Sequence, residues 1–475
     1  MGHMARLMFF VLLLLGPALA QNLVALAPQG AVAGFYLADL RGSPYLRGFA
    51  SDWKASGMEA LLGQELRQQA GQATDLLGLA AGGLVAAAYP DGFFVLGRPS
   101  PAALEALRKE ARGLRPVGGW QVGGDRDVQI GLSRELFFAA SPKHAQLFLQ
   151  NRRGLQAPAQ GDIVFWASLS QELAQNLGLP PMTSRALRTL GRFSYSLRLT
   201  PGGYTEETRL ELNPSLDPRL AGLLLPKERP YDPAELPQGY SVTTGVFDLG
   251  RFTAYLKGLL GELNVPLELD LSAFGARYAL VSVKGPPPAP DGRGEGLLGH
   301  TLIYWEVKDP NLAEANLTAL FRGLAAFSTP EGQGGFRTLG SVGGFKAVEV
   351  GLAGVFYYRL EPNRLTLATS KSALEAVGNP PWGRDPDFRR FRVRVPTNAI
   401  GFTYSNQGAL MREQAALLAG LLPQAIGQAG GFERRLGRAL SGFLERAAQR
   451  FGPGLSYTVV EGHRRLSRGF YEVRW

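Results

Sequence analysis

The strongest constraint on the fold of this 475-residue chain is an internal repeat. A Pro-Gln-Gly triplet at Pro28 opens an apolar segment that ends at Asp39, and the same triplet at Pro237 opens an apolar segment that ends at Asp248. The two prolines lie 209 positions apart, and so do the two aspartates. Matches in one order at a nearly constant spacing predict that one architecture is written twice along the chain.

Each half is expected to alternate short groups of strands with single helices. Runs such as 279–283 and 301–307 alternate apolar and polar residues and are rich in β-branched and aromatic side chains, which is typical of strands. A helix is predicted over 102–113, with Ser100 as N-cap and Pro101 in its first turn. The expected order is strand, long helix, two strands, helix, three strands, helix, strand, helix and two strands. Hairpin-spaced strands mixed with helices indicate an α+β fold with antiparallel sheets packed by helices, in two tandem homologous lobes.

Composition shifts along the chain predict four segments. Residues 1–20 are expected to be a signal peptide, 21–219 the first α+β repeat, 220–235 a proline-containing linker and 236–475 the second repeat. Pro226, Pro230 and Pro233 fall in or beside the linker, where regular secondary structure is expected to stop because proline removes a backbone donor.

The N-terminal residues have the pattern of a secretory signal. Arg6 precedes an uninterrupted apolar run over 7–15, and Ala18-Leu19-Ala20 forms a small-x-small site with cleavage expected between Ala20 and Gln21. We therefore expect an exported protein, periplasmic or extracellular, whose mature chain is soluble or peripheral. The chain has no cysteine, which excludes disulfides and thiolate chemistry.

The net charge of +10 is concentrated near the C-terminus. From Arg384 onward the chain carries 15 arginines against 7 acidic residues. One group of these arginines is expected to precede or enter a strand, and another is expected to lie on a helix away from its apolar stripe. If the two groups converge, they would form a surface for an anionic polymer, a lipid headgroup or, less expected, nucleic acid. The candidate residues are Arg389, Arg390, Arg392, Arg394, Arg434, Arg435 and Arg438. The alternative is a set of scattered arginines paired with nearby acids.

No motif in the chain specifies a known chemistry. His144, His300 and His463 match no metal-binding or catalytic spacing, and isolated surface or turn positions are expected for them. Ser51 and Lys54 form a Ser-x-x-Lys pattern, but no Ser-Asp-Asn or Lys-Thr-Gly motif follows, so a surface turn of a helix is expected.

Three further patterns are expected to be structural. The glycines from Gly294 to Gly299 satisfy G-x-G-x-x-G but leave a proline-rich loop and enter a strand, which is the wrong context for a nucleotide site. Asp125 is expected at a hairpin tip, and Asp39 and Asp248 as N-caps or turn residues. We therefore predict no catalytic residue, no cofactor and no metal, and hence no enzyme.

Several local patterns resemble a bacterial exported family known as domain of unknown function 3352. They are the opening Pro-x-Gly strand, the transitions from strand to helix at Ser141 and Ser370, and Asp387-Phe388 ahead of Val395-Pro396. The resemblance implies the fold class and export, and it implies no site residues.

Two functional classes follow from the absence of a catalytic set. The first is a non-enzymatic cell-envelope protein that binds another protein or an anionic envelope polymer, with possible peripheral membrane contact. The alternative is a periplasmic carrier of a lipid or another apolar ligand, which would need a large apolar cavity. The sequence indicates neither the ligand nor the oligomeric state.

Overall fold

The computed structural model describes residues 21–39, 44–61, 76–111, 113–151, 154–157, 159–168, 181–261, 270–286, 299–328, 335–413, 415 and 431–474. The chain divides into two compact units, with the boundary between Leu216 and Asp217. We call the N-terminal part unit 1 and the part from Asp217 to Arg474 unit 2. The predicted signal peptide and its cleavage site after Ala20 lie outside the described residues.

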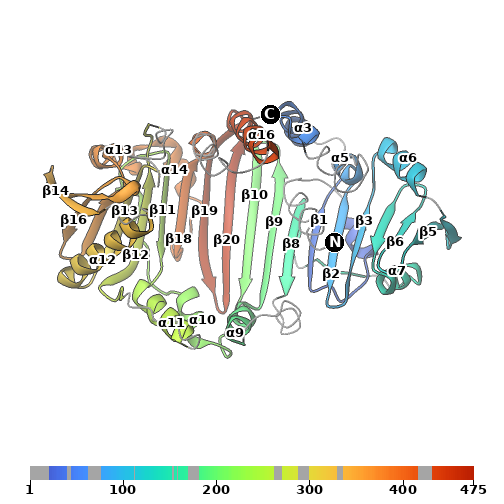
Figure 1. Cartoon of the computed structure of the whole chain (residues 1–475), viewed down its shortest axis with the longest axis horizontal. Helices are drawn as coiled ribbons and strands as arrows, with labels where there is room; N and C mark the ends of the chain where they lie inside the picture. The colour runs from blue at the N-terminus through green and yellow to red at the C-terminus, as the bar shows by residue number, and fades with distance from the viewer. Residues whose placement is uncertain are drawn as a thin grey trace. The chain divides into compact units, whose positions relative to one another are not determined.

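Unit 1 contains one antiparallel sheet (Figure 1). Its strands are β1 (Ala33–Leu37), β2 (Leu84–Tyr89), β3 (Gly92–Gly97), β4 (Arg115–Val117), β5 (Trp120–Gly124), β6 (Gln129–Leu132), β7 (Phe137–Ala140), β8 (Ile163–Ser168), β9 (Arg192–Thr200) and β10 (Gly203–Glu211). Their order across the sheet is β10-β9-β8-β1-β2-β3-β7-β6-β5-β4. The helices are α2 (Gln21–Leu26), α3 (Pro44–Ala55), α5 (Leu76–Ala80), α6 (Pro101–Glu110), α7 (Pro142–Leu149) and α9 (Pro181–Leu190).

Unit 2 also contains one antiparallel sheet. Its strands are β11 (Ser241–Val246), β12 (Phe274–Ser282), β13 (Thr301–Val307), β14 (Phe336–Val342), β15 (Phe345–Val350), β16 (Val355–Glu361), β17 (Arg364–Ala368), β18 (Gly401–Asn406), β19 (Phe451–Glu461) and β20 (Arg464–Val473). Their order across the sheet is β20-β19-β18-β11-β12-β13-β17-β16-β15-β14.

Short and long helices alternate with the strands of unit 2. The α-helices are α10 (Pro218–Leu224), α11 (Leu249–Gly261), α12 (Pro310–Ser328), α13 (Lys371–Glu375), α14 (Pro386–Arg392) and α16 (Gly431–Ala448). Four 3-10 helices complete the described set, namely η1 (Pro233–Glu235), η2 (Gly351–Ala353), η3 (Ala376–Gly378) and η4 (Trp382–Arg384). The predicted α+β class with antiparallel sheets is confirmed. None of the helices in the described part of the chain is long and apolar enough to cross a membrane.

The predicted element order needs two corrections. Four consecutive strands, β4–β7 and β14–β17, stand where three were expected. The predicted structureless linker is wrong, because α10 and η1 lie in this part of the chain. The side chains of Asp217 and Asp232 accept backbone hydrogen bonds at the first turns of these helices, and Pro218 and Pro233 occupy first-turn positions where a missing N–H costs nothing.

Each sheet is buried on both faces along part of its width. In unit 1, one face packs around Phe94, Phe138 and Phe148, and the other around Phe35 and Leu37. Successive side chains of a strand point to opposite faces, so Tyr36 and Phe35 enter different clusters. The same division occurs in unit 2, where Phe321 of α12 belongs to a cluster on one face and Phe388 of α14 to a cluster on the other.

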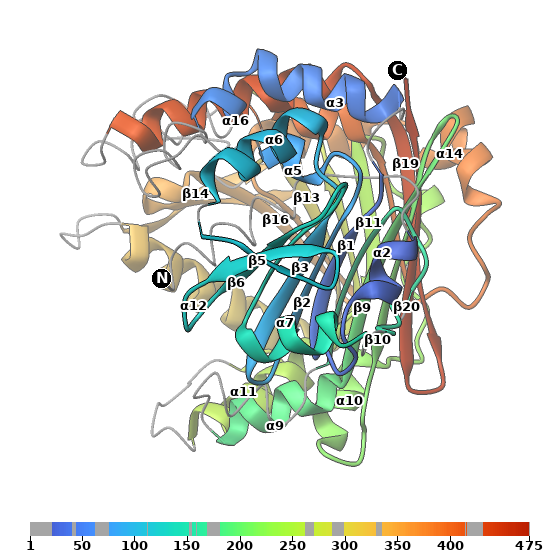
Figure 2. The same ribbon diagram turned by 90° about the vertical axis from the view of Figure 1, so that its right-hand side faces the viewer.

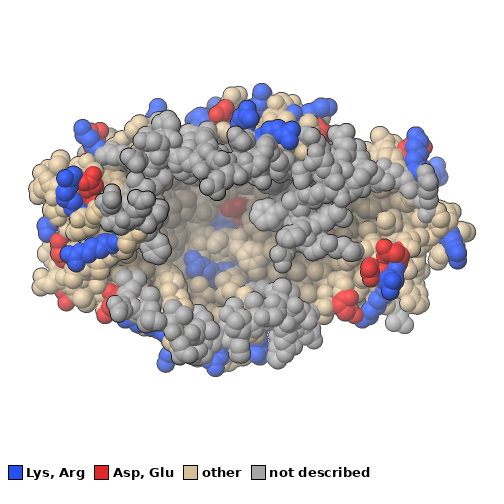
Figure 3. All heavy atoms as spheres, viewed as in Figure 1, with Lys and Arg blue, Asp and Glu red and all other residues tan. Residues whose placement is uncertain are grey.

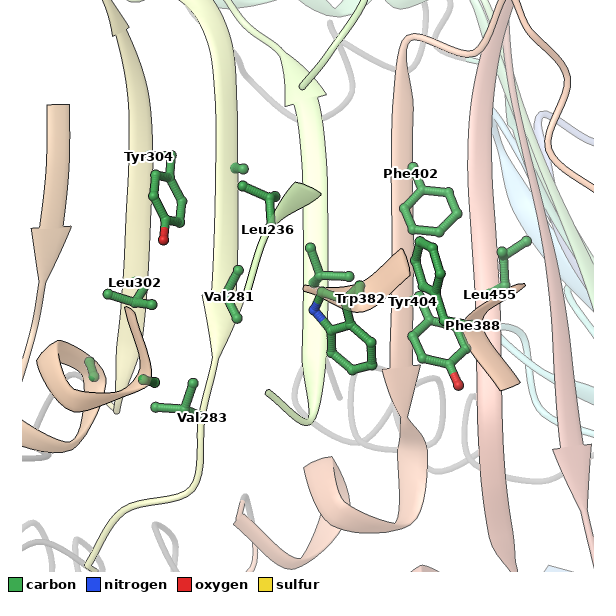
Figure 4. Close-up of a cluster of buried hydrophobic side chains, with 14 of the residues drawn as sticks. Leu236, Val281, Val283, Leu302, Tyr304, Trp382, Phe388, Phe402, Tyr404 and Leu455 are labelled. Atoms are coloured by element: carbon green, nitrogen blue, oxygen red, sulfur yellow. The ribbon is translucent and has the colours of Figure 1, made fainter. Parts of the chain in front are cut away.

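We call the unit 2 face covered by α14 the aromatic face. Figure 4 shows Phe388 gathered with Phe402 and Tyr404 of β18, beside Trp382 of η4. The ring of Phe388 lies 5.8 Å from that of Phe402 and 5.4 Å from that of Tyr404, both near perpendicular. Edge-to-face pairs of this kind add to the free energy gained from burial. They hold α14 on the sheet and so position the arginines that it carries.

Candidate functional site: the arginine cluster at α14

Helix α14 begins at an aspartate cap. The side chain of Asp385 accepts a hydrogen bond from the backbone N–H of Phe388 at 2.7 Å, and Pro386 occupies the first turn. Phe388 and Phe391 are buried, and the residues between and after them are arginines. The segment is therefore a helix that precedes β18, so these arginines precede a strand, as one of the two predicted alternatives stated, and do not enter it. The Asp-Pro pair at its start was a helix signal available in the sequence.

One arginine of the helix is paired with acids. Arg390 lies 3.0 Å from Asp387 and 2.6 Å from Glu472 on β20. The hydrogen bond to Glu472 is the main cause that raises the pKa of Arg390 above its usual value. Its charge is therefore largely compensated within the protein.

The other arginines around α14 have no such compensation. Among the described residues, no carboxylate lies within 4.0 Å of the guanidinium groups of Arg384, Arg389, Arg392 or Arg394. Arg384, Arg389 and Arg394 are exposed, and Arg392 is half-buried. We call these four residues the arginine cluster. The alternative of arginines paired with nearby acids applies here to Arg390 alone.

Aromatic rings support part of the cluster. The guanidinium carbon of Arg394 lies 5.3 Å from the ring centres of both Phe391 and Phe470, and that of Arg392 lies 5.9 Å from the ring of Phe402. Stacking on an aromatic face limits the motion of a guanidinium group while its donors stay available. Between these two arginines, Val393 is 84% exposed. The cluster thus combines uncompensated positive charge with an exposed apolar side chain.

The remaining predicted anion-binding residues lie elsewhere. Arg435 and Arg438 are exposed on α16, and the side chain of Arg434 lies outside the described residues. Figures 1 and 2 place α14 and α16 on opposite sides of β19 and β20. The two groups therefore do not meet in one surface.

Two histidines predicted to be isolated surface or turn residues are buried. His144 is 2% exposed, with Nδ1 2.8 Å from Ser141 Oγ and Nε2 3.5 Å from Asp91. Burial is the main cause that lowers the pKa of His144, and the Asp91 carboxylate acts against it. The ring also stacks on Tyr89 at 4.0 Å.

In unit 2 the serine at the corresponding position after β17 also contacts a histidine, but this histidine lies immediately before β13. His300 is 1% exposed, with Nδ1 2.8 Å from Ser370 Oγ and Nε2 2.7 Å from the carbonyl oxygen of Pro286. Ser370 also caps α13 by accepting from the N–H of Ala373 at 3.1 Å. Because Ser370 caps α13 and His300 bonds to the carbonyl group of Pro286, the pair connects the segments before β13 and after β17. His463 is exposed in a turn, as predicted.

Other candidate residues occupy the structural positions expected for them. Ser51 and Lys54 are exposed on α3. Asp125 accepts from the backbone N–H groups of Asp127 and Val128 at 2.8 Å each, which forms a hairpin tip.

The paired aspartates and the glycine pattern have mixed outcomes. Asp248 accepts from the N–H of Arg251 at 2.9 Å at the start of α11, as predicted for an N-cap. Asp39 follows β1 and is half-buried, and the glycine pattern before Gly299 lies outside the described residues. In the ranges given above, no group of three or more His, Asp or Glu side chains is placed to hold a metal ion.

Comparisons with known proteins add little to this geometry. No family model matches the chain, and no curated protein matches it. Among solved structures, "Structure of crystal form I of TP0453" matches with a TM-score of 0.27 and 12% identity, covering 44% of this chain and 89% of that chain. "Structure of crystal form III of TP0453" matches with a TM-score of 0.24 and 11% identity, covering 40% and 79%. Scores this low carry no argument about function, and the resemblance to the exported family stays a prediction.

Proposed function

We propose that this protein is an exported, non-enzymatic cell-envelope protein that binds an anionic, phosphate-bearing envelope polymer through the arginine cluster. The observation that carries the proposal is the set of four guanidinium groups at α14 without a carboxylate partner among the described residues. Each planar guanidinium can donate two hydrogen bonds to one phosphate group, which favours Arg over Lys at such a site.

Positive charge left uncompensated on a surface attracts polyanions over a distance of several ångströms. Helix α14 is rigid because Phe388 and Phe391 anchor it, so little conformational entropy is lost when a polymer contacts Arg389 and Arg392. A repeating polyanion can engage several guanidinium groups at once, which multiplies weak contacts into useful affinity. These arguments support a polymer more than a small ion.

Two grooves in the described part of the chain have linings of mixed polarity, with charged side chains among them. One groove of about 540 Å³ in unit 2 is lined by Lys284 and Glu375 among others, and one of about 590 Å³ in unit 1 by Arg108 and Arg134 among others. A lipid site would be lined mainly by apolar side chains. We therefore keep polymer binding as the proposal.

We further propose that the two units are copies of one ancestral α+β unit. The order of their ten strands is the same when β1 is matched with β11 and each following strand with its counterpart. Asp39 and Asp248 follow the matched strands β1 and β11, and Ser141 and Ser370 follow β7 and β17. The arginine cluster belongs to unit 2 alone, so we expect polymer binding to reside there.

The test measures binding of poly(glycerol phosphate) to the mature chain over a series of salt concentrations. The variant R389Q/R392Q/R394Q should bind about tenfold more weakly, since each exposed charge contact contributes up to about 1 kcal/mol. The matched control R251Q/R322Q/R337Q removes the same charge from other parts of unit 2, including two arginines that form ion pairs.

The control should retain most of the binding, and the affinity of the unmodified protein should fall steeply with salt. Equal losses in both triple variants would show that only net charge matters and would contradict a site at α14. Binding to anionic vesicles but not to the polymer would redirect the proposal to a membrane surface, where the exposed Val393 could insert.

A further inference from the structure

The sheet face of unit 2 opposite the aromatic face is rich in hydroxyl groups. Strand pairing fixes which residues share it, because alternate residues of β11, β12, β18, β19 and β20 enter the aromatic-face cluster and the residues between them point the other way. We call this the hydroxyl face. Its side chains include Thr243, Thr403, Ser405, Ser456, Thr458 and Ser467.

Four of these hydroxyls are paired across strands and remain partly accessible. Thr243 Oγ1 lies 3.2 Å from Thr403 Oγ1, and Thr458 Oγ1 lies 2.8 Å from Ser467 Oγ. All four of these residues are half-buried. A hydroxyl that makes one hydrogen bond still has further donor or acceptor capacity. The face can therefore bind additional polar groups without losing its internal bonds.

One of two paired glycines leaves room above the face. Gly245 and Gly401 are paired neighbours on β11 and β18. The space over Gly245 is filled by Tyr278, since a Cβ there would lie 2.6 Å from the phenol oxygen. Over Gly401 a Cβ would meet nothing closer than Thr458 at 3.6 Å, an ordinary contact. Tyr278 stacks on Trp305 with ring centres 5.2 Å apart, so one side of the open space is aromatic.

Arg465 supplies a positive charge at the other side of this face. It belongs to β20, opposite Val460, and among the described residues no carboxylate forms an ion pair with it. Burial is the main cause that lowers the pKa of Arg465, with the Tyr278 phenol acting against it. By strand register, Arg465 shares the hydroxyl face with Ser467, two positions further along β20, and Tyr278 shares the same face on β12.

Figure 3 views unit 2 from this side, and both basic and acidic side chains are visible on its hollowed surface. A partly desolvated guanidinium without a carboxylate carries a free-energy cost that an anionic ligand would remove. Hydroxyl groups and an aromatic pair beside that charge match a ligand with several hydroxyls of its own and one anionic group.

We propose that the hydroxyl face of unit 2 binds a sugar phosphate, with Arg465 on the phosphate and the Ser and Thr hydroxyls on the sugar. The guanidinium group donates paired hydrogen bonds to the phosphate oxygens, and the stacked rings of Tyr278 and Trp305 lie on the same face of the sheet. This site lies on the opposite side of the sheet from the arginine cluster and does not depend on polymer binding there.

Isothermal titration calorimetry of the mature chain with glucose 6-phosphate tests the proposal, with glucose and inorganic phosphate as the two partial probes. The sugar phosphate should bind at least about tenfold more tightly than either partial probe, since each lacks one half of the contacts. R465Q should weaken binding by about tenfold or more, as expected for loss of a charge-assisted hydrogen bond. The control R468Q removes a charge from the same strand but on the aromatic face, and it should bind within about twofold of the unmodified protein.

A second pair of variants tests the open space without removing any polar group. G401L places a side chain over the middle of the hydroxyl face and should abolish binding, whereas G323L, on α12 where a Cβ meets nothing within 4 Å, should leave it unchanged. Circular dichroism checks that both variants fold.

Three results would overturn the inference. The first is that the sugar phosphate shows no saturable binding up to about 10 mM, because a weaker affinity corresponds to a binding free energy too small for a site. The second is that R465Q and R468Q bind the sugar phosphate equally, and the third is that phosphate alone binds as tightly as the sugar phosphate. The variant R389Q/R392Q/R394Q should retain sugar-phosphate binding, which separates failure of this site from failure of the arginine cluster.

Discussion

At the scale of single residues, the serines of the two serine–histidine pairs differ in burial and in their hydrogen bonds, and so in their expected contribution to the free energy of unfolding. Ser370 bonds to His300 and also caps α13, and it is fully buried. Ser141 bonds to His144 and, at 3.3–3.4 Å, to the backbone of Phe93, but its side chain makes no cap bond to α7 and is half-buried. Water can replace lost bonds at Ser141 more easily than at Ser370, because an unpaired buried group pays its full desolvation cost.

We therefore expect S370A to lower the free energy of unfolding by about 2 kcal/mol, and S141A by less than about 1 kcal/mol. Urea unfolding of both variants, followed by tryptophan fluorescence, measures the difference. Equal losses would show that burial of the serine is not what sets the cost.

At the scale of elements, the side-chain carboxylate of Glu306 lies at a β-bulge in the pairing of β12 with β13. The pairing of these strands shifts register between Phe274 and Tyr278. Glu306 of β13 accepts from the backbone N–H groups of Ala276 and Arg277 at 3.1 and 3.3 Å, and from the Arg277 guanidinium at 2.6 Å. The carboxylate thus satisfies donors that the bulge would leave unpaired.

This arrangement predicts a pH-dependent contribution to stability. Burial acts to raise the pKa of Glu306, but the bonds from Arg277 and the backbone outweigh it, and the pKa is lowered. A lowered pKa in the folded state stabilises the protein above the unfolded value of about 4.3, and this stabilisation is lost as the pH falls through the folded pKa. We expect E306Q to cost about 1–2 kcal/mol at pH 7 and little near pH 3, as measured by urea unfolding at both values.

The control for this prediction is E349Q, which breaks the exposed pair with Arg337 on β14. It should cost less than about 0.5 kcal/mol at either pH, since exposed ion pairs are weak. A cost of E306Q that is the same at pH 3 and pH 7 would mean that side-chain shape, not charge, stabilises the bulge.

At the scale of the whole molecule, each unit has its own aromatic core. Phe148 of α7 is buried among rings of unit 1, and Phe388 of α14 among rings of unit 2. Separate cores allow two units to unfold in separate steps, and then one unfolding temperature does not describe the protein.

We expect calorimetry to resolve two transitions. F148A should lower the midpoint of one and F388A that of the other, each by removing about 3–5 kcal/mol of core packing. If both variants shift one shared transition, the two units unfold as a single cooperative structure.

The sequence alone was enough to predict the kinds of elements and much of their order. Strand alternation and helix caps are local, and they operate within a few residues, as at Ser100 and Pro101 of α6, where the hydroxyl accepts from Ala103 as predicted. Strand β4 was missed because Arg115–Val117 is exposed at every position and contains a proline. It is a strand only because β5 pairs with it.

Only the tertiary structure decided which side chains meet. Ser370 and His300 are 70 positions apart, and Arg465 shares a sheet face with Tyr278 only after β20, β19, β18, β11 and β12 are placed in order. The sequence located the arginine-rich end, but it could not tell that α14 and α16 would take opposite faces. Contacts between distant segments depend on strand register and sheet curvature, and those follow from packing of the whole core and not from any local pattern.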